Sequence, residues 1–139
     1  LKKGGTFLIF TSTSEQMKNY WLNHYFPEMM KKSISQMPSF NFIKENIEKV
    51  GFENFEIEKY FIKDDLEDKF LYIGKNNPKI YFDSTIRNGI SSFADLANKE
   101  EIEKGLNSLK NDLITGDSYN VKSNFKDNKG DYLFIKIKK

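Results

Sequence analysis

Four consecutive apolar residues, Phe7 to Phe10, limit what this chain can fold into more than any other feature of its sequence. They follow a pair of glycines and precede Thr11 and Ser12. A strand exposed on one face alternates apolar and polar residues, whereas an uninterrupted apolar run is typical of a strand covered on both faces, as in parallel sheets. We therefore predict a buried strand over 6–11 that begins an α/β domain.

Length, charge and cysteine content exclude several classes of protein. The 139 residues fit one domain, and a net charge of +2 without grouped basic residues disfavours a nucleic-acid or membrane-surface partner. The absence of cysteine excludes disulfides and thiolate chemistry, and no apolar run approaches the roughly 18 residues of a membrane span. We expect a cytoplasmic protein.

The remaining residues alternate between helical and strand patterns. Capping residues and apolar spacing predict helices over 13–26, 39–50, 64–73 and 98–116, and a further helix that starts at Pro78. Period-two alternation predicts strands over 52–62 and 131–138, with 121–125 as a candidate partner of the last strand, and turns over 1–5 and 127–130. Three strands are few for a parallel α/β domain, which indicates that part of the sheet is missing.

Three segments carry a resemblance to class I S-adenosylmethionine-dependent methyltransferases. Residues 1–9, Leu-Lys-Lys-Gly-Gly and then an apolar strand, resemble the turn and fifth strand of that family, with Lys3 where proline is usual. Residues 50–58 resemble its sixth strand, and residues 130–135 resemble its seventh, antiparallel strand. The resemblance implies an α/β fold: a partial Rossmann-like sheet of the last three strands, the final one antiparallel.

The same resemblance implies a domain organisation and an activity. Residues 1–139 would be the C-terminal part of a methyltransferase domain, with 63–126 a helical substrate cap inserted between its last two strands. The parent protein would methylate a small-molecule acceptor, and this part would supply the acceptor side and be inactive alone. The chain starts at Leu1 rather than Met, and it lacks the glycine-rich loop that opens such domains. We therefore expect S-adenosylmethionine to be bound mainly by a missing N-terminal half.

An open edge on the first strand follows from that interpretation. The missing half would pair with this edge, and a long apolar edge strand invites pairing with another copy of the chain. We therefore expect the isolated chain to form a homodimer through it.

Six residues are candidates for the acceptor site, each with a structural alternative. Polar residues at a strand end lie where ligands bind in α/β sheets, although they also cap helices. Aromatic residues line either pockets or cores. The single histidine is a candidate base, although no carboxylate partner is evident. The single arginine would bind an anionic group of the acceptor or form a surface ion pair. The candidates are Thr11, Ser12, Trp21, His24, Tyr25 and Arg87. One histidine and scattered carboxylates do not indicate a metal site.

A second interpretation belongs to a different class of protein. The chain would be a complete, non-enzymatic α+β module that binds a ligand or a partner protein through the aromatic residues around Trp21. The residues encoded upstream of Leu1 distinguish the two interpretations, because a Gly-x-Gly pattern there favours the enzyme and a start codon favours the module.

Overall fold

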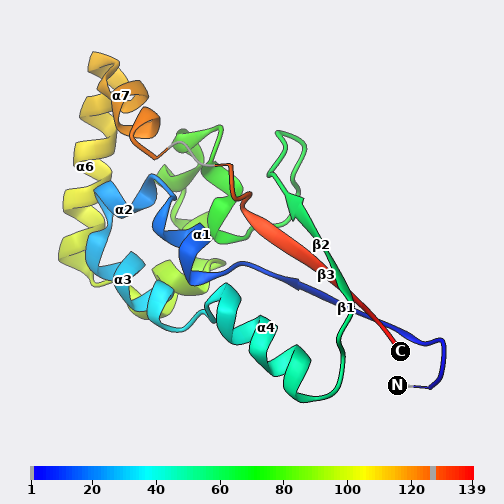
Figure 1. Cartoon of the computed structure of the whole chain (residues 1–139). Helices are drawn as coiled ribbons and strands as arrows, with labels where there is room; N and C mark the ends of the chain where they lie inside the picture. Colours follow the sequence, from blue (N-terminus) through cyan, green and yellow to red (C-terminus); the bar gives the residue numbers. More distant parts are fainter. Residues whose placement is uncertain (1, 126–127) are drawn as a thin grey trace.

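A small sheet projects from a body of helices in this computed structural model, which describes residues 2–125 and 128–139 (Figure 1). The strands are β1 (Thr6–Thr11), β2 (Phe55–Tyr60) and β3 (Tyr132–Lys138). The α-helices are α1 (Ser14–Lys18), α2 (Leu22–Tyr25), α3 (Pro27–Ser35), α4 (Phe40–Lys49), α5 (Ser84–Asn88), α6 (Lys99–Thr115) and α7 (Asp117–Ser123). Two short 3₁₀ helices, η1 (Leu71–Gly74) and η2 (Pro78–Phe82), and a π-helical turn, η3 (Ser92–Leu96), complete the fold.

The three strands form one sheet in the order β1-β3-β2. β3 runs antiparallel to both neighbours, with Ile135 between Ile9 and Ile57, so β1 and β2 point in the same direction. The prediction of an antiparallel final strand is confirmed. Within the described residues β1 pairs with β3 alone, so its outer edge is open, as expected.

Helix α4 covers one face of the sheet. The Ser39 hydroxyl accepts a hydrogen bond from the Phe42 amide at 3.1 Å and begins the helix, and Gly51 follows its end at a φ of +89°. Ile47 packs against Ile135 and Ile137, both almost completely buried. This contact holds the sheet and α4 together as a small core separate from that of the helical body.

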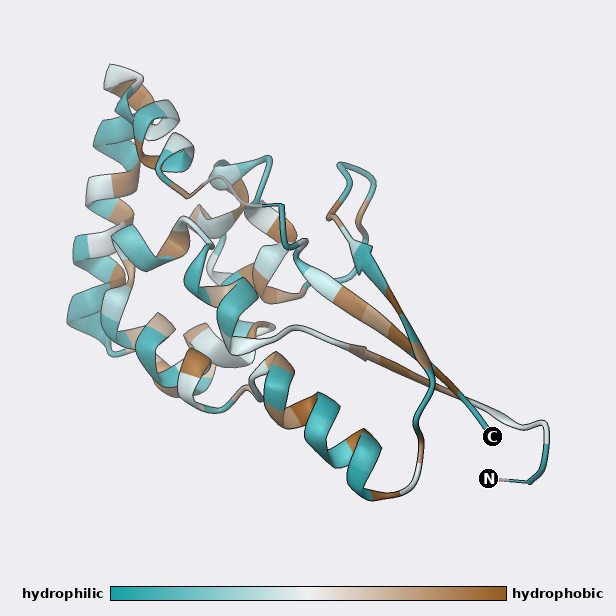
Figure 2. Ribbon diagram, viewed as in Figure 1, coloured by the Kyte–Doolittle hydropathy of each residue, from teal (hydrophilic) through white to brown (hydrophobic). Residues whose placement is uncertain are grey.

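The opposite face of the sheet is exposed. Leu8 and Phe10 are 56% and 43% exposed, although the Phe10 ring stacks on Tyr132 at 4.8 Å and lies 4.6 Å from Phe134. Figure 2 shows the hydrophobic residues along β1 and β3 where they leave the helices. The prediction that 6–11 is covered on both faces is therefore wrong for these 139 residues, since α4 covers one face and no described element covers the other.

The helical body is built from two parts of the chain that share one core. Tyr20, Phe26 and Met29 come from the segment between β1 and α4, and Tyr81 and Leu109 come from the segment between β2 and β3. The described residues of 63–126, the predicted helical cap, thus pack together with α1 to α3. None of the described helices combines the length and apolarity needed to cross a membrane.

Some predicted elements differ from those observed. The predicted helix 13–26 is split into α1 and α2, 64–73 contains only η1, and 121–125 falls in α7 and the turn after it rather than in a strand. Helix α3 was not predicted. The two predicted turns contain Leu1 and Asp127, which lie outside the described residues.

Candidate functional site

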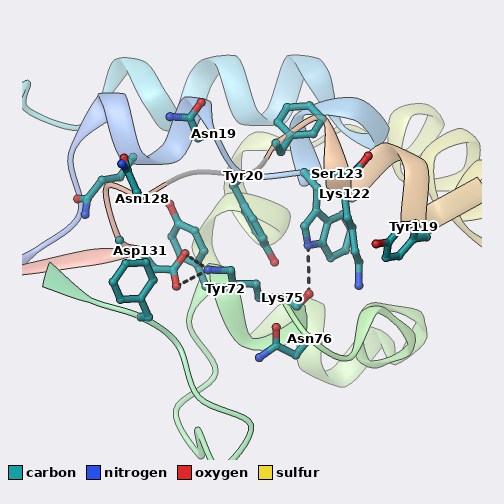
Figure 3. Close-up of a pocket in the computed structure, with 15 residues that line it drawn as sticks. Asn19, Tyr20, Tyr72, Lys75, Asn76, Tyr119, Lys122, Ser123, Asn128 and Asp131 are labelled. Carbon is teal, nitrogen blue, oxygen red and sulfur yellow. Dashed lines mark hydrogen bonds and ion pairs between the residues drawn. The ribbon is translucent and has the colours of Figure 1, made fainter.

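A pocket of about 900 Å³ opens between the sheet and the helical body (Figure 3). Gln16 follows β1, Phe61 follows β2 and Asp131 precedes β3, so the pocket lies at the carboxyl ends of the two strands that share a direction. Open α/β sheets bind their ligands at this end. The pocket is lined by Gln16, Asn19, Tyr20, Trp21, Phe61, Tyr72, Lys75, Asn76, Tyr119, Lys122, Ser123, Phe125, Asn128, Gly130 and Asp131. We call it the aromatic pocket, because six of these residues are aromatic.

The chain reaches the pocket from β1 through a capping box. The Thr13 hydroxyl accepts a hydrogen bond from the Gln16 amide at 3.2 Å, and the Gln16 side chain accepts one from the Thr13 amide at 2.9 Å. The Gln16 Nε2 also donates to the Lys129 carbonyl at 3.1 Å. One buried glutamine therefore fixes the start of α1 and fastens it to the loop before β3.

Tyrosine and tryptophan rings form the back wall. The Tyr20 ring lies 4.4 Å from the Tyr72 ring and 5.3 Å from Trp21, centre to centre. The Trp21 indole N–H donates to the Lys75 carbonyl at 3.2 Å, which orients the ring between α1 and η1. Buried aromatic residues with their polar atoms bonded in this way form a rigid, preformed wall.

The carboxylate in the pocket lining, Asp131, already has an ion-pair partner and a hydrogen-bond donor within the chain. Lys75 Nζ lies 2.6 Å from both oxygens of Asp131, and the Ile62 amide donates to Asp131 Oδ2 at 2.8 Å. Asp131 is 6% exposed. The pair joins η1 to the start of β3, and the charge of Asp131 is balanced before any ligand arrives.

The hydroxyl groups in the wall remain protonated. Burial raises the pKa of Tyr72 and, with the neighbouring Tyr81, raises that of Tyr20 well above its usual value. These groups can donate or accept hydrogen bonds but cannot act as bases near neutral pH.

Lys122 on α7 brings a second positive charge to the pocket. Its Nζ lies 5.2 Å from the centre of the Trp21 ring, a cation–π contact. Partial burial lowers the pKa of its ammonium group. Among the described residues no carboxylate lies within ion-pair distance of Lys122, whereas Asp131 neutralises Lys75.

Two of the six predicted site residues lie at or beside the aromatic pocket. Trp21 lines it, and the Ser12 hydroxyl is buried 3.5 Å from the Tyr72 hydroxyl behind the wall. Thr11 lies at the end of β1, where its Oγ1 donates to the Ser12 carbonyl at 2.9 Å and does not reach the pocket lining.

The other three predicted residues lie elsewhere. His24 is exposed on α2 and outside the pocket lining, so it is not placed to act there as a base. The buried Tyr25 donates to Asp112 Oδ2 on α6 at 2.9 Å. The Arg87 guanidinium donates to the Tyr81 carbonyl, which is a structural contact within the helical body.

Sequence reasoning missed most of the polar residues of the pocket. Lys75 and Asp131 are 56 positions apart, and the stretch that contains Lys122 was interpreted as a strand. The spacing of Val121 and Phe125 gave no signal, because residues four positions apart share a face in a helix and in a strand alike. In the described part of the chain, no three His, Asp or Glu side chains gather in a way that could hold a metal ion.

One solved structure resembles this fold over nearly its whole length. It is described as "Putative methyltransferase from antibiotic biosynthesis pathway" from Anabaena variabilis ATCC 29413, with a TM-score of 0.75 and 29% sequence identity. The match covers 96% of this chain and 54% of the Anabaena chain, so the present chain spans about half the length of that protein. No protein-family model and no curated protein matches the sequence. The chain is thus related in structure to a methyltransferase.

Proposed function

We propose that these residues form the acceptor-binding, C-terminal part of an enzyme that transfers a methyl group from S-adenosylmethionine to a small molecule. The observation that carries the proposal is the position of the aromatic pocket. It lies at the carboxyl ends of β1 and β2, in a fold that resembles a methyltransferase.

The surface of the sheet supports the claim that a further part of the domain exists. β1 carries apolar residues on both faces. Helix α4 covers one face only in part, since Ile9 packs against its core while Phe7 stays 50% exposed, and the outer edge of β1 is unpaired among the described residues. In the proposed parent, additional strands continue the sheet at β1 in a Rossmann-like order, and additional helices cover Leu8 and Phe10. A complete binding module would leave this apolar surface in water at a cost in free energy.

The helical body would form the acceptor cap of that enzyme. Residues 63–126 are the proposed insertion between the last two strands, and α1 to α3 complete it from the other side of the pocket. Because loops and inserted helices carry much of the substrate selectivity of α/β enzymes, this body is the expected determinant of acceptor choice. A cytoplasmic location remains a prediction.

The aromatic pocket does not fit the methyl donor. Asp131 is already bonded to Lys75 and to the Ile62 amide, so it is not available to hold ribose hydroxyls. Lys122 lies over one face of the Trp21 ring, and its positive charge would repel a sulfonium cation. A Cβ on Gly130 would lie 3.2 Å from the Tyr60 carbonyl oxygen, so the missing side chain at this position serves packing against the end of β2.

The residues of this chain would therefore position the acceptor and exclude water. S-adenosylmethionine supplies an electrophilic methyl group, and orientation of the acceptor is worth up to roughly 7–11 kcal/mol in well-aligned reactions. Because Tyr20 and Tyr72 stay protonated and Asp131 is paired, none of these three groups is poised to take a proton from the acceptor. The arrangement suits an acceptor that arrives already deprotonated.

The test is transfer of a tritiated methyl group from S-adenosylmethionine by the parent protein to a panel of small aromatic and aliphatic acceptors. The proposal requires acceptor-dependent incorporation and a Gly-x-Gly pattern encoded about a hundred residues upstream of Leu1. An upstream sequence without such a pattern, together with no incorporation for any acceptor, would refute it.

The open edge of β1 gives a first prediction. We propose that the isolated chain pairs with a second copy through this edge, because an unpaired apolar strand is a template for strand addition. Leu8→Lys should lower the dimer fraction at least about tenfold, since a charge would then have to be buried at the contact. Analytical ultracentrifugation measures this fraction directly.

Ile114→Lys is the matched control, because Ile114 is 74% exposed on α6, away from the sheet. It should leave the association unchanged. A wild-type chain that stays monomeric at millimolar concentration, or equal effects of the two variants, would show that the edge does not pair with a second copy.

A further inference from the structure

We propose that the aromatic pocket selects a planar aromatic acceptor that carries an anionic group, a carboxylate or phenolate, with the anion held by Lys122. The proposal deepens the proposed function, because it names the class of acceptor. Its main test is a binding experiment that requires no methyl transfer.

The shape and lining of the pocket favour a flat ring. Tyr20, Trp21 and Tyr72 form one wall, and Phe61 also lines the pocket, with Lys75 Nζ 5.8 Å from its ring centre. Figure 3 shows the rings of Tyr20 and Tyr72 beside the Lys75–Asp131 pair. Lys122 lies over the Trp21 ring, 5.2 Å from its centre. Stacked or edge-on aromatic contacts contribute on the order of 0.5–1.5 kcal/mol each beyond area burial, and an aliphatic ligand does not gain this contribution.

The charge balance of the pocket favours an anion. Its lining contains two lysines and one aspartate, and the aspartate is bidentate to Lys75. The Lys122 side chain is half-buried, and its ammonium lies over the weakly negative face of the Trp21 ring. A cation that has lost part of its hydration and has no described carboxylate partner gains most from a ligand that brings the opposite charge.

The position of Lys122 beside Trp21 allows one ligand to meet both requirements, an aromatic ring and an anionic group. Because the ammonium lies 5.2 Å from the ring centre, a ligand ring stacked on the aromatic wall can present a substituent to the ammonium without leaving the wall. Asn19, Asn76 and Asn128 around the pocket supply amide groups for additional polar substituents. The inference therefore specifies an aromatic ring with an acidic group attached to it directly.

The experiment uses the single tryptophan of the chain, Trp21, as its reporter. The indole N–H signal of ¹⁵N-labelled protein is followed by NMR while 2-naphthoate, 2-naphthylmethanol or octanoate is added. The proposal predicts a saturable shift with 2-naphthoate and at least about tenfold weaker binding of the neutral alcohol and of the aliphatic anion.

Lys122→Gln should weaken 2-naphthoate binding about tenfold and leave the binding of 2-naphthylmethanol unchanged, since only the charge contact is lost. Lys110→Gln removes the same charge from an exposed position on α6 and should have no effect.

The proposal is overturned if 2-naphthoate does not shift the indole signal at millimolar concentration or if the alcohol binds as tightly as 2-naphthoate. Equal affinities of Lys122→Gln and wild type for 2-naphthoate would also overturn it.

The two proposals can fail separately. Selective, Lys122-dependent binding of 2-naphthoate without any methyl transfer by the parent would support the ligand class and reject the enzyme. Transfer to neutral or aliphatic acceptors only would support the enzyme and reject the ligand class.

Discussion

Gly105→Ala should destabilise the chain by about 3 kcal/mol, although alanine is the better helix former. A Cβ at position 105 of α6 would lie 2.5 Å from the Tyr25 carbonyl oxygen and closer still to the Phe26 ring. Neither atom group can move aside, because Phe26 is completely buried in the core and the carbonyl belongs to the backbone of α2. Overpacking usually costs about 1–3 kcal/mol, and contacts as short as these with groups that cannot move exceed that range, at about 4 kcal/mol. About 3 kcal/mol therefore remains after the roughly 1 kcal/mol of helix propensity gained is subtracted.

Urea denaturation followed by circular dichroism measures the effect as a lower midpoint at an unchanged slope. Asn107→Ala on the same helix is the control, because Asn107 is exposed and its replacement should change the stability by only a few tenths of a kcal/mol. A Gly105→Ala variant as stable as the control would show that α6 does not pack on α2 at this distance.

Tyr81→Phe should also destabilise the chain by about 3 kcal/mol, because it leaves several buried polar groups without partners. The Tyr81 hydroxyl donates to the Leu71 carbonyl, and it accepts hydrogen bonds from the Gly74 amide at 3.1 Å and the Tyr20 hydroxyl at 2.6 Å. Tyr81 is completely buried. This one hydroxyl group therefore joins η1, η2 and the turn between α1 and α2 behind the pocket wall.

Tyr20→Phe is the matched comparison and should cost only about 1 kcal/mol. It removes one donor, while the Tyr81 hydroxyl keeps its bonds to Gly74 and Leu71. Urea denaturation of both variants gives the ranking. Equal costs for the two variants would contradict the assignment of Tyr81 as the central hydroxyl.

Local signals in the sequence predicted the elements whose ends are set by local chemistry. Ser39 and Asn98 cap α4 and α6 as expected, since a side-chain oxygen three residues before a free amide needs no tertiary partner. Gly51 and Gly116 follow the ends of these helices at positive φ, which glycine adopts without strain. The strands around Ile57 and Ile135 were predictable from their alternation.

Tertiary contacts decided the elements that were predicted wrongly. The predicted helix 13–26 breaks after α1, because the Asn23 side chain donates to the carbonyls of Met17 and Tyr20 at 2.8 and 2.7 Å. Such competition between side chain and backbone is not visible in the apolar spacing. The burial of Phe7 to Phe10 was overestimated. An apolar run indicates that both faces of a strand are buried in the complete domain, but it does not show whether residues of this chain bury them.

The candidate site was predictable only where it follows β1. Trp21 was identified because it lies on the helical segment after a strand end, which is a local argument. Lys75, Lys122 and Asp131 come together through the packing of η1, α7 and β3, and nothing in their sequence surroundings indicates that contact. His24 and Arg87 were selected for their rarity in the sequence, and rarity carries no information about position.

Calorimetric titration of S-adenosylmethionine into residues 1–139 tests the central claim, that this chain supplies the acceptor side and not the donor side. The aromatic pocket has no free carboxylate among its described residues, and Lys122 places a positive charge over one face of Trp21. We therefore predict no heat of binding up to several millimolar donor, which corresponds to less than about 4 kcal/mol of binding free energy. A 1:1 complex in the micromolar range would contradict the account, because it would place the donor site within these residues.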